Sequence, residues 1–294
     1  MTPAVTTRAL GCCFGDLWAL RDCTFELPAG RVAAVVGPNG AGKTTLLNML
    51  VGLLAPSEGE AKVFDAIPDD TPAFLGRVGF VAQDAPLYRD FSAADHLRMG
   101  RHLNPIWHES SVREWLLAAE VPLDRPASTL SGGQRAQLAL ALAAGKVPDL
   151  LILDEPLASL DPIARRDFMR SLMSTSATGP TVMLSSHLIS DLANVCDFLL
   201  VIVHGRLRLV GDLHDLLAQH RWIVASTDDA DRLPAGVEVV VAYEQQRSTR
   251  LLVRTTEPLL NPALITKPVD LEDLVLGYLE TKTHSAAPNL QVRT

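Results

Sequence analysis

The sequence lacks an apolar run long enough to cross a membrane. Its apolar stretches, such as 46–54, 138–144 and 198–203, fall well short of the roughly 18 residues that a membrane span needs. Residues 1–10 also lack the charged start and long apolar segment of a signal peptide. These two absences predict a soluble chain that reaches a membrane only through a partner.

Basic residues and cysteines are also scarce. Lys and Arg number 26 against 34 Asp and Glu, and the formal net charge is -8. A protein whose main partner is nucleic acid needs a basic stripe to neutralise phosphates, and this sequence shows none. The cysteines, Cys12, Cys13, Cys23 and Cys196, have neither metal-ligand nor redox spacing, which predicts buried free thiols in a reducing compartment.

What the chain does have is an ordinary globular composition and a glycine-rich loop. Hydrophobic residues make up 48% of the 294 residues, enough for one large domain or a main domain with a small appendage. The loop reads Gly37-Pro38-Asn39-Gly40-Ala41-Gly42-Lys43-Thr44-Thr45 and lies between a strand-like run, 32–36, and a helix-like run, 46–54.

This order of strand, loop and helix is the context of a phosphate-binding loop. The glycines allow positive φ and bring N–H groups close to an anion, and the helix N-terminus adds its dipole. Lys43 would reach the β and γ phosphates, the Thr44 hydroxyl would coordinate Mg²⁺, and Thr45 could bond a further phosphate oxygen.

An acidic pair follows the apolar run 150–153. Acids at the carboxyl end of a buried strand lie where open α/β sheets bind their ligands. Asp154 would therefore hold the Mg²⁺ shell, and Glu155 would polarise a water for in-line attack on the γ phosphate.

A second glycine-rich helix start, Ser131-Gly132-Gly133-Gln134, precedes the apolar run 136–144. It is either a capping serine followed by flexible glycines or another anion-receiving N-terminus. Two such sites in one domain would bind two phosphates unless they face different molecules.

Four further residues have candidate roles, and three of them allow more than one interpretation. Phe14 is core or stacks on a flat base, and Gln83 caps a strand or bonds Mg²⁺ or the attacking water. Asp161 caps the helix that starts at Pro162, which alone would explain it. His187, just past the strand-like run 181–185, is an ordinary loop residue or a contact to the γ phosphate.

The pattern divides the chain into three regions. Residues 1–220 form the main α/β domain, within which 84–130 are an inserted helical subdomain carrying His96, His102 and His108 on its surface. From about 222 the pattern resets to a small α+β extension, 221–294, that ends in a polar tail.

Taken together, the motifs resemble those of the nucleotide-binding subunits of ATP-binding cassette (ABC) transporters, over roughly residues 5–220. The corresponding motifs are the Walker A loop at 37–45, the Q-loop at Gln83, the signature at Leu130–Gln134, Walker B at 150–155, the D-loop at Ser159–Asp161 and the switch histidine at His187. Phe14 lies where that family usually has a tyrosine that stacks on adenine.

The resemblance implies a P-loop NTPase fold with an antiparallel β-subdomain, ATP and Mg²⁺ as ligands, and ATP hydrolysis. Nucleotide would be bound by Phe14, 37–45, Ser131–Gln134 and Asp161, hydrolysis would use Glu155, His187 and Gln83, and Mg²⁺ would be held by Thr44, Gln83 and Asp154. The resemblance also implies a head-to-tail dimer, with itself or another ABC ATPase, and an integral membrane permease at the cytoplasmic face of the membrane.

Within the family, the β-rich extension and the segment Leu271–Leu276 resemble ATPases of ABC-2 type exporters, including drug-resistance systems. Importer ATPases are an alternative. Rivals from other classes are a soluble ABC protein of translation or DNA maintenance and a P-loop kinase for a small molecule.

Overall fold

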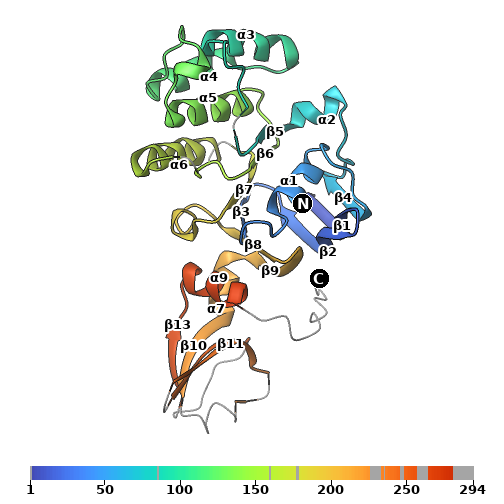
Figure 1. Cartoon of the computed structure of the whole chain (residues 1–294), viewed down its shortest axis with the longest axis vertical. Coiled ribbons are helices and arrows are strands. Elements are labelled where there is room, and N and C mark those ends of the chain that lie inside the picture. The colour runs from blue at the N-terminus through green and yellow to red at the C-terminus, as the bar shows by residue number, and fades with distance from the viewer. Residues whose placement is uncertain are drawn as a thin grey trace. The chain divides into compact units, whose positions relative to one another are not determined.

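The structure is a computed structural model that describes residues 2–84, 86–158, 160–176, 179–225, 233–234, 236–245, 248–256 and 264–280. The expected polar tail, 281–294, and Ser159 of the expected D-loop lie outside these residues. The chain divides into two compact units, Met1–Asp215 and Leu216–Thr294, which are described separately (Figure 1).

The first unit is built on a six-stranded sheet in the order β5-β6-β7-β3-β8-β9. The strands are β5 (Val78–Val81), β6 (Leu150–Leu153), β7 (Thr181–Ser186), β3 (Val32–Val36), β8 (Phe198–Val203) and β9 (Arg206–Asp212). All neighbours pair in parallel except β9, which runs antiparallel to β8. Strands β3, β6, β7 and β8 are buried along their whole length, as expected for the interior of a parallel sheet.

A separate antiparallel sheet, β2-β1-β4, packs with helix α1 (Lys43–Leu50) on the first sheet. Its strands are β1 (Pro3–Phe14), β2 (Leu17–Pro28) and β4 (Glu58–Val63). Apolar side chains from both sheets and the helix, including Leu10, Phe25, Leu47 and Ile152, share one buried cluster. The P-loop helix is therefore fixed between two sheets.

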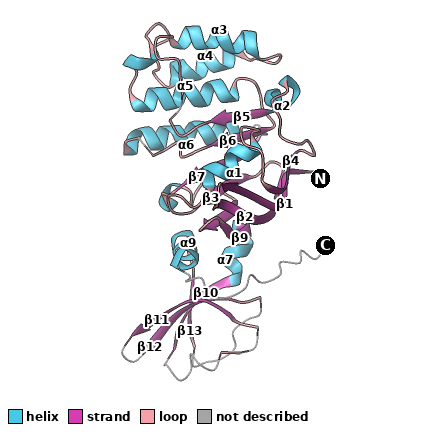
Figure 2. Cartoon of the chain, turned by 45° about the vertical axis from the view of Figure 1, so that its right-hand side comes forward, coloured by secondary structure: helices cyan, strands magenta, loops and turns pink. Residues whose placement is uncertain are grey.

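A helical layer adjoins the other end of the large sheet (Figure 2). It contains α2 (Pro72–Arg77), α3 (Ala93–Leu103), α4 (Glu109–Ala118), η1 (Ala127–Thr129), α5 (Gly132–Ala144) and α6 (Pro162–Ser176). Leu97, Val112 and Leu116 pack with Leu138 in a core of their own, so that this core extends past residue 130 into α5.

The expectation that His96 is a surface residue is wrong. His96 is 1% exposed and packs beside the rings of Tyr88 and Phe91. Its Nδ1 donates to the Ser92 carbonyl at 2.8 Å, and its Nε2 accepts from the Tyr88 N–H at 3.1 Å. The imidazole closes the loop before α3 because a neutral ring can be buried when both nitrogens are hydrogen-bonded.

The four cysteines are free, and Cys12, Cys23 and Cys196 are buried while Cys13 is half-buried. Burial raises the pKa of the Cys23 thiol to about 11 and that of Cys196 to about 12. These thiols therefore stay protonated at neutral pH and act as small apolar side chains.

Beyond Asp215 the described residues form a four-stranded antiparallel sheet in the order β11-β12-β10-β13, together with α9 (Leu271–Glu280). The strands are β10 (His220–Ala225), β11 (Glu238–Gln245), β12 (Ser248–Arg254) and β13 (Ile265–Pro268), and helix α7 (Leu213–Gln219) leads into β10. Ile223, Leu251 and Val253 form a buried cluster of this unit.

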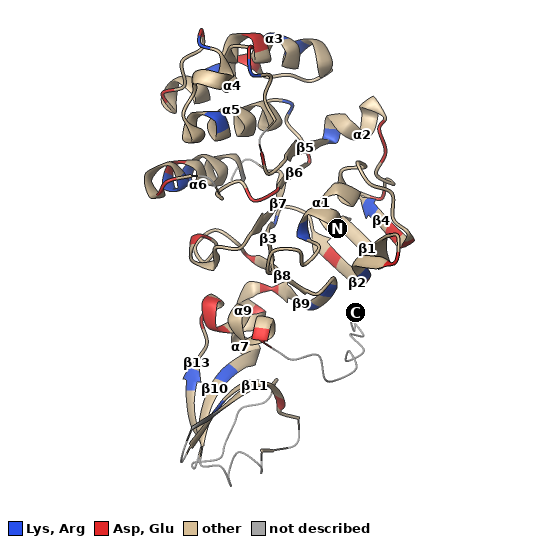
Figure 3. Cartoon of the chain, in the orientation of Figure 1, with Lys and Arg blue, Asp and Glu red and all other residues tan. Residues whose placement is uncertain are grey.

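Charged residues are mixed along the elements of the first unit, with Lys and Arg among Asp and Glu (Figure 3). Among the described residues, none of the helices combines the length and the apolar character of a membrane span.

Candidate active site

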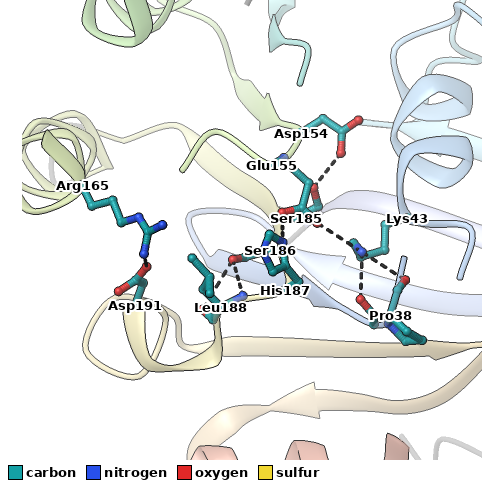
Figure 4. A network of polar contacts seen from close by, with 11 residues as sticks. Pro38, Lys43, Asp154, Glu155, Arg165, Ser185, Ser186, His187, Leu188 and Asp191 are labelled. Atoms are coloured by element: carbon teal, nitrogen blue, oxygen red, sulfur yellow. Dashed lines mark hydrogen bonds and ion pairs between the residues drawn. The ribbon is translucent and has the colours of Figure 1, made fainter. Parts of the chain in front are cut away.

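The strand order brings the three chemistry-bearing segments to one edge of the large sheet. Strands β6, β7 and β3 are parallel neighbours, so their carboxyl ends lie side by side. The glycine loop follows β3, Asp154 and Glu155 follow β6, and His187 follows β7 (Figure 4). This edge is where open α/β sheets bind ligands.

Two glycines of the loop are required by close backbone contacts. A Cβ on Gly37 would lie 2.2 Å from the Ile202 carbonyl oxygen, and one on Gly42 would lie 2.4 Å from the Ala19 carbonyl oxygen. Gly42 also has φ +104° and forms the N-cap of α1. Only glycine lets the loop run this close to β8 and β2.

The loop presents free N–H groups at the start of α1. Ala41 donates to the Pro38 carbonyl and Leu46 to that of Gly42. The N–H groups of Gly42, Lys43, Thr44 and Thr45 make no hydrogen bond within the described part of the chain. Unpaired donors at a helix N-terminus, together with a lysine, fit the phosphates of a nucleotide.

Lys43 and Glu155 form a buried ion pair, and the exposed His187 side chain contacts the same carboxylate. Lys43 Nζ donates to the carbonyls of Gly37 at 2.8 Å and Pro38 at 3.3 Å, and lies 3.2 Å from Glu155 Oε1. Among the described residues, Glu155 Oε1 has this ion pair but no hydrogen-bond partner. His187 Nδ1 donates to Glu155 Oε2 at 2.8 Å. Because the Lys43 and Glu155 side chains are 5% and 8% exposed, each charge is compensated chiefly by the other.

Ser185 is a residue of the site that the sequence analysis missed. Its hydroxyl donates to Asp154 Oδ1 at 2.7 Å and accepts the Glu155 N–H at 2.8 Å. One side chain on β7 thus orients both acids that follow β6. The signal in the sequence was the pair Ser185-Ser186 at the end of an apolar strand, because a polar group buried there needs a partner.

The donors expected to hold Mg²⁺ are all oxygens. Thr44 is exposed in the first turn of α1, Asp154 is 1% exposed with one oxygen fixed by Ser185, and Gln83 is exposed in the turn after β5. The described residues contain no group of three or more His, Cys, Asp or Glu that would hold a metal on its own. Mg²⁺ commonly uses one or two protein oxygens and completes its shell with phosphates and water, so this sparse set fits it.

The second glycine-rich helix start forms a capping box. Ser131 Oγ accepts the Gln134 N–H, and Gln134 Oε1 accepts the Ser131 N–H. Asp161 caps α6 through the N–H groups of Ile163 and Ala164. The N-terminal ends of α5 and α6 adjoin each other, since a Cβ on Gly133 would lie 2.9 Å from the Cβ of Ala164.

The remaining candidates lie outside this contact network. Within the described residues, Ser131, Asp161, Gln83 and Phe14 have no hydrogen bond or ion pair with Lys43, Asp154, Glu155 or His187. Phe14 ends β1 and is 55% exposed, so the interpretation of it as core is wrong. Its ring is open to solvent beside the turn of the β1–β2 hairpin.

Sequences of known proteins align with this chain over most of its length. The Nod factor export ATP-binding protein I of Cupriavidus pinatubonensis is 33% identical over 90% of this chain and 86% of that protein. The protein of the same name from Cupriavidus metallidurans is 36% identical over 94% and 97%. The molybdenum import ATP-binding protein ModC of Mycobacterium tuberculosis is 36% identical over 68% of this chain and 58% of that protein.

Solved structures agree with the fold. An ATP-binding subunit of an ABC transporter superposes with a TM-score of 0.66 and 25% identity, over 74% of this chain and 92% of that chain. A bacterial Atm1-family ABC exporter with ATP bound gives 0.64 and 28%, over 74% and 40%.

The sequence model of the ABC transporter family matches residues 20–158, which contain the loop, the second glycine-rich start and the acidic pair. The P-loop NTPase fold with its antiparallel β-sheet and helical layer, predicted from the motifs, is confirmed. By motif order, fold and near full-length relatives, the chain belongs to the ABC transporter family as an ATP-binding subunit.

Proposed function

We propose that this chain is the ATP-hydrolysing subunit of an exporter, working as a head-to-tail dimer that drives a separate integral membrane permease. The export-named relatives support the direction because they match 90% and 94% of the chain, more than Met1–Asp215 alone supplies. The importer ModC matches 68% at similar identity, which keeps import as the second candidate. In either case the chain would sit on the cytoplasmic face of the membrane, held there by the permease.

Binding of ATP begins at the loop. The N–H groups of 42–45 and the Lys43 ammonium would receive the phosphates, with Phe14 offering an exposed ring to the adenine. The phosphates would compete with Glu155 for Lys43, because both are anions at one ammonium. Loading the loop would thus free the Glu155 carboxylate.

Hydrolysis then uses the freed acid. Glu155 would accept a proton from the water that attacks the γ phosphorus as the bond to the ADP oxygen breaks. His187, which holds Glu155 through Nδ1, has its Nε2 available to the γ phosphate, and Gln83 would orient the water. Mg²⁺, held by Thr44, Asp154 and Gln83, would neutralise charge on the phosphates.

One observation supports the dimer: within the described residues, the second glycine-rich helix start makes no contact with the Lys43 site. Ser131, Gly132, Gly133, Gln134 and Asp161 lie apart from the Lys43 network within the described chain. A cavity of about 1480 Å³, lined mainly by residues of α4, α5 and α6, includes none of Lys43, Glu155 and His187. In the dimer that we propose, the signature residues of a second copy would close over the P-loop.

The test is Glu155→Gln, which keeps the shape of the side chain and removes the base. We expect ATP binding to persist, phosphate release without any acceptor to fall by about 10²-fold or more, and a dimer to accumulate with ATP in light scattering. Wild-type turnover of this variant would refute the assignment of the base. A monomer at saturating ATP would refute the dimer.

The membrane partner calls for a separate measurement. The chain is co-expressed with a multi-span protein encoded beside it and reconstituted into vesicles, and ATP-driven movement of solute is followed. Movement away from the ATPase side supports export, and movement toward it supports the import candidate. Capture of ribosomes or DNA, with no membrane protein, would overturn both.

A further inference from the structure

An incompletely closed ion pair joins the helix after Asp161 to the turn after His187. Arg165 Nη1 on α6 lies 3.9 Å from Asp191 Oδ2 in η2 (Ile189–Asp191) (Figure 4). The two side chains are only partly exposed, at 29% and 26%. Arg165 Nε and Asp191 Oδ2 are each inaccessible to solvent and have no hydrogen-bond partner among the described residues.

Each partner is tied to a different part of the site. The Arg165 N–H donates to the Asp161 carbonyl at 2.9 Å, in the first turn of α6. Asp191 ends a tight turn that starts at His187. In that turn Ser186 Oγ accepts the Leu188 N–H at 3.0 Å, and fully buried Leu192 anchors the far end. His187 in turn contacts Glu155.

The distance is the informative quantity. A charge-assisted N–H···O bond is about 2.7–2.9 Å long, so the 3.9 Å between Arg165 Nη1 and Asp191 Oδ2 is too long for one and leaves this buried oxygen without a donor. Leaving a buried carboxylate oxygen unpaired is costly, and a shift of about an ångström between α6 and the turn would let Arg165 donate to it. The pair therefore favours the closer arrangement.

We propose that Arg165 and Asp191 close into a hydrogen-bonded pair in the hydrolysing state, and that Asp191 is a positioning residue that sets His187 against Glu155. This inference rests on the proposed function, because it concerns how that hydrolytic site is assembled. It makes the N-terminal turn of α6, with Asp161, and the turn of His187 move as one piece.

The same helix offers matched controls. Asp167 forms ion pairs with Arg166 at 4.0 Å and with Arg170 at 3.3 Å, and the side chains of Asp167, Arg166 and Arg170 are 45%, 71% and 69% exposed. An exposed pair of this kind contributes little to stability or to geometry. Arg166→Gln and Asp167→Asn therefore make the same chemical changes as Arg165→Gln and Asp191→Asn, but in exposed side chains outside the site.

The experiment measures steady-state ATP hydrolysis of the full chain across pH, together with ATP affinity and thermal midpoint. We expect Arg165→Gln and Asp191→Asn each to lower kcat about tenfold, to shift the pH profile of kcat, and to leave KM within about twofold. The double variant should be no slower than either single variant, since the two changes remove one interaction. The exchanged pair Arg165→Asp with Asp191→Arg should recover part of the loss.

Several outcomes would overturn the inference. The first is that kcat and its pH profile equal those of the two control variants. The second is that the losses of kcat multiply in the double variant. The third is that the losses of kcat can be explained by a lower thermal midpoint alone. Glu155→Gln is assayed in parallel. If it hydrolyses ATP normally, the proposed function fails; if it is inactive while Asp191→Asn is normal, only the present inference fails.

Discussion

The backbone of Glu155 is held in the left-handed region, with φ +47°. For a residue with a Cβ this costs about 1–2 kcal/mol, which other contacts must offset. Those contacts come from β7 through Ser185 and His187, and from the loop through Lys43. The direction of the carboxylate is therefore set by the neighbouring strands, and the site depends on the pairing of β6 with β7.

His220 in the second unit gives a pH prediction at the same scale. It is fully buried, its Nδ1 donates to the Leu216 carbonyl at 2.6 Å, and its Nε2 accepts from the Tyr278 hydroxyl at 2.9 Å. Burial raises the pKa of Tyr278 to about 12, so the hydroxyl keeps its proton and donates. Burial is also the main cause that lowers the pKa of His220 below 6.5, and Arg254 and Arg221 add to it.

The sign follows from proton binding. Below pH 6.5 the unfolded chain binds a proton at His220 that the folded chain does not, so the free energy of unfolding falls as pH falls. We expect His220→Gln to flatten this loss between about pH 7.5 and 5.5, and exposed His214→Gln to keep it, in denaturant titrations of the full chain. Equal slopes for the two variants would contradict the assignment.

The residues that sequence reasoning could place were those whose type and position at a strand end indicate chemistry. Lys43, Asp154, Glu155 and His187 follow three apolar runs, and the structure joins them in one network. Ser185 was missed because a serine at the end of an apolar strand does not by itself show which acids it contacts. Arg165 and Asp191 were not predicted because their pairing depends on how α6 packs, which no local sequence pattern indicates.

At the scale of elements, apolar runs between glycines and prolines predicted the buried strands well. Strand β3 has the bounds expected from 32–36, whereas the longer strand β1, Pro3–Phe14, has a less regular pattern. The difference has a physical cause. β1 carries register shifts between Thr7 and Leu10 and between Leu10 and Cys12, and Ala9 has φ +45°. Such bulges interrupt the alternation on which a strand is recognised.

The glycine loop gives a prediction for the element that binds phosphate. Gly42 and Gly40 both have positive φ, but only a Cβ on Gly42 meets backbone, at 2.4 Å from the Ala19 oxygen. Gly40→Ala should cost about 1 kcal/mol of unfolding free energy from its backbone alone. Gly42→Ala should cost about 2 kcal/mol more, because β2 must also move. Denaturant titration without nucleotide measures both costs. Equal losses of unfolding free energy would show that β2 can move away from residue 42 at little cost.

At the scale of the whole molecule, the sequence indicated a change of pattern near 222, and the contacts divide the chain after Asp215. Helix α7 crosses that division, so its local pattern assigns it to neither side. The helical layer shows the same effect, since α5 begins after the expected end at 130 and shares the core of α3 and α4. Boundaries depend on which surfaces pack, whereas periodicity reports only that an element exists.

The last prediction concerns the assembly of two copies. If each ATP is gripped by the loop of one copy and the Ser131 helix start of the other, Lys43→Ala and Ser131→Arg damage opposite halves of a site. Each variant alone should be inactive, while their mixed dimer keeps one intact site. With random pairing, an equal mixture should recover about a quarter of the wild-type rate of ATP hydrolysis.

The control for this mixture is Lys43→Ala with Glu155→Gln, which lie 3.2 Å apart in the same copy. Both changes damage the same half of a site, so their mixed dimer has no intact pair and should stay inactive. Recovery in the first mixture and not in the second can arise only when the two halves come from different copies, because sites completed within one chain gain nothing from mixing. An inactive first mixture, with dimers present by light scattering, would show that the loop is completed within its own chain.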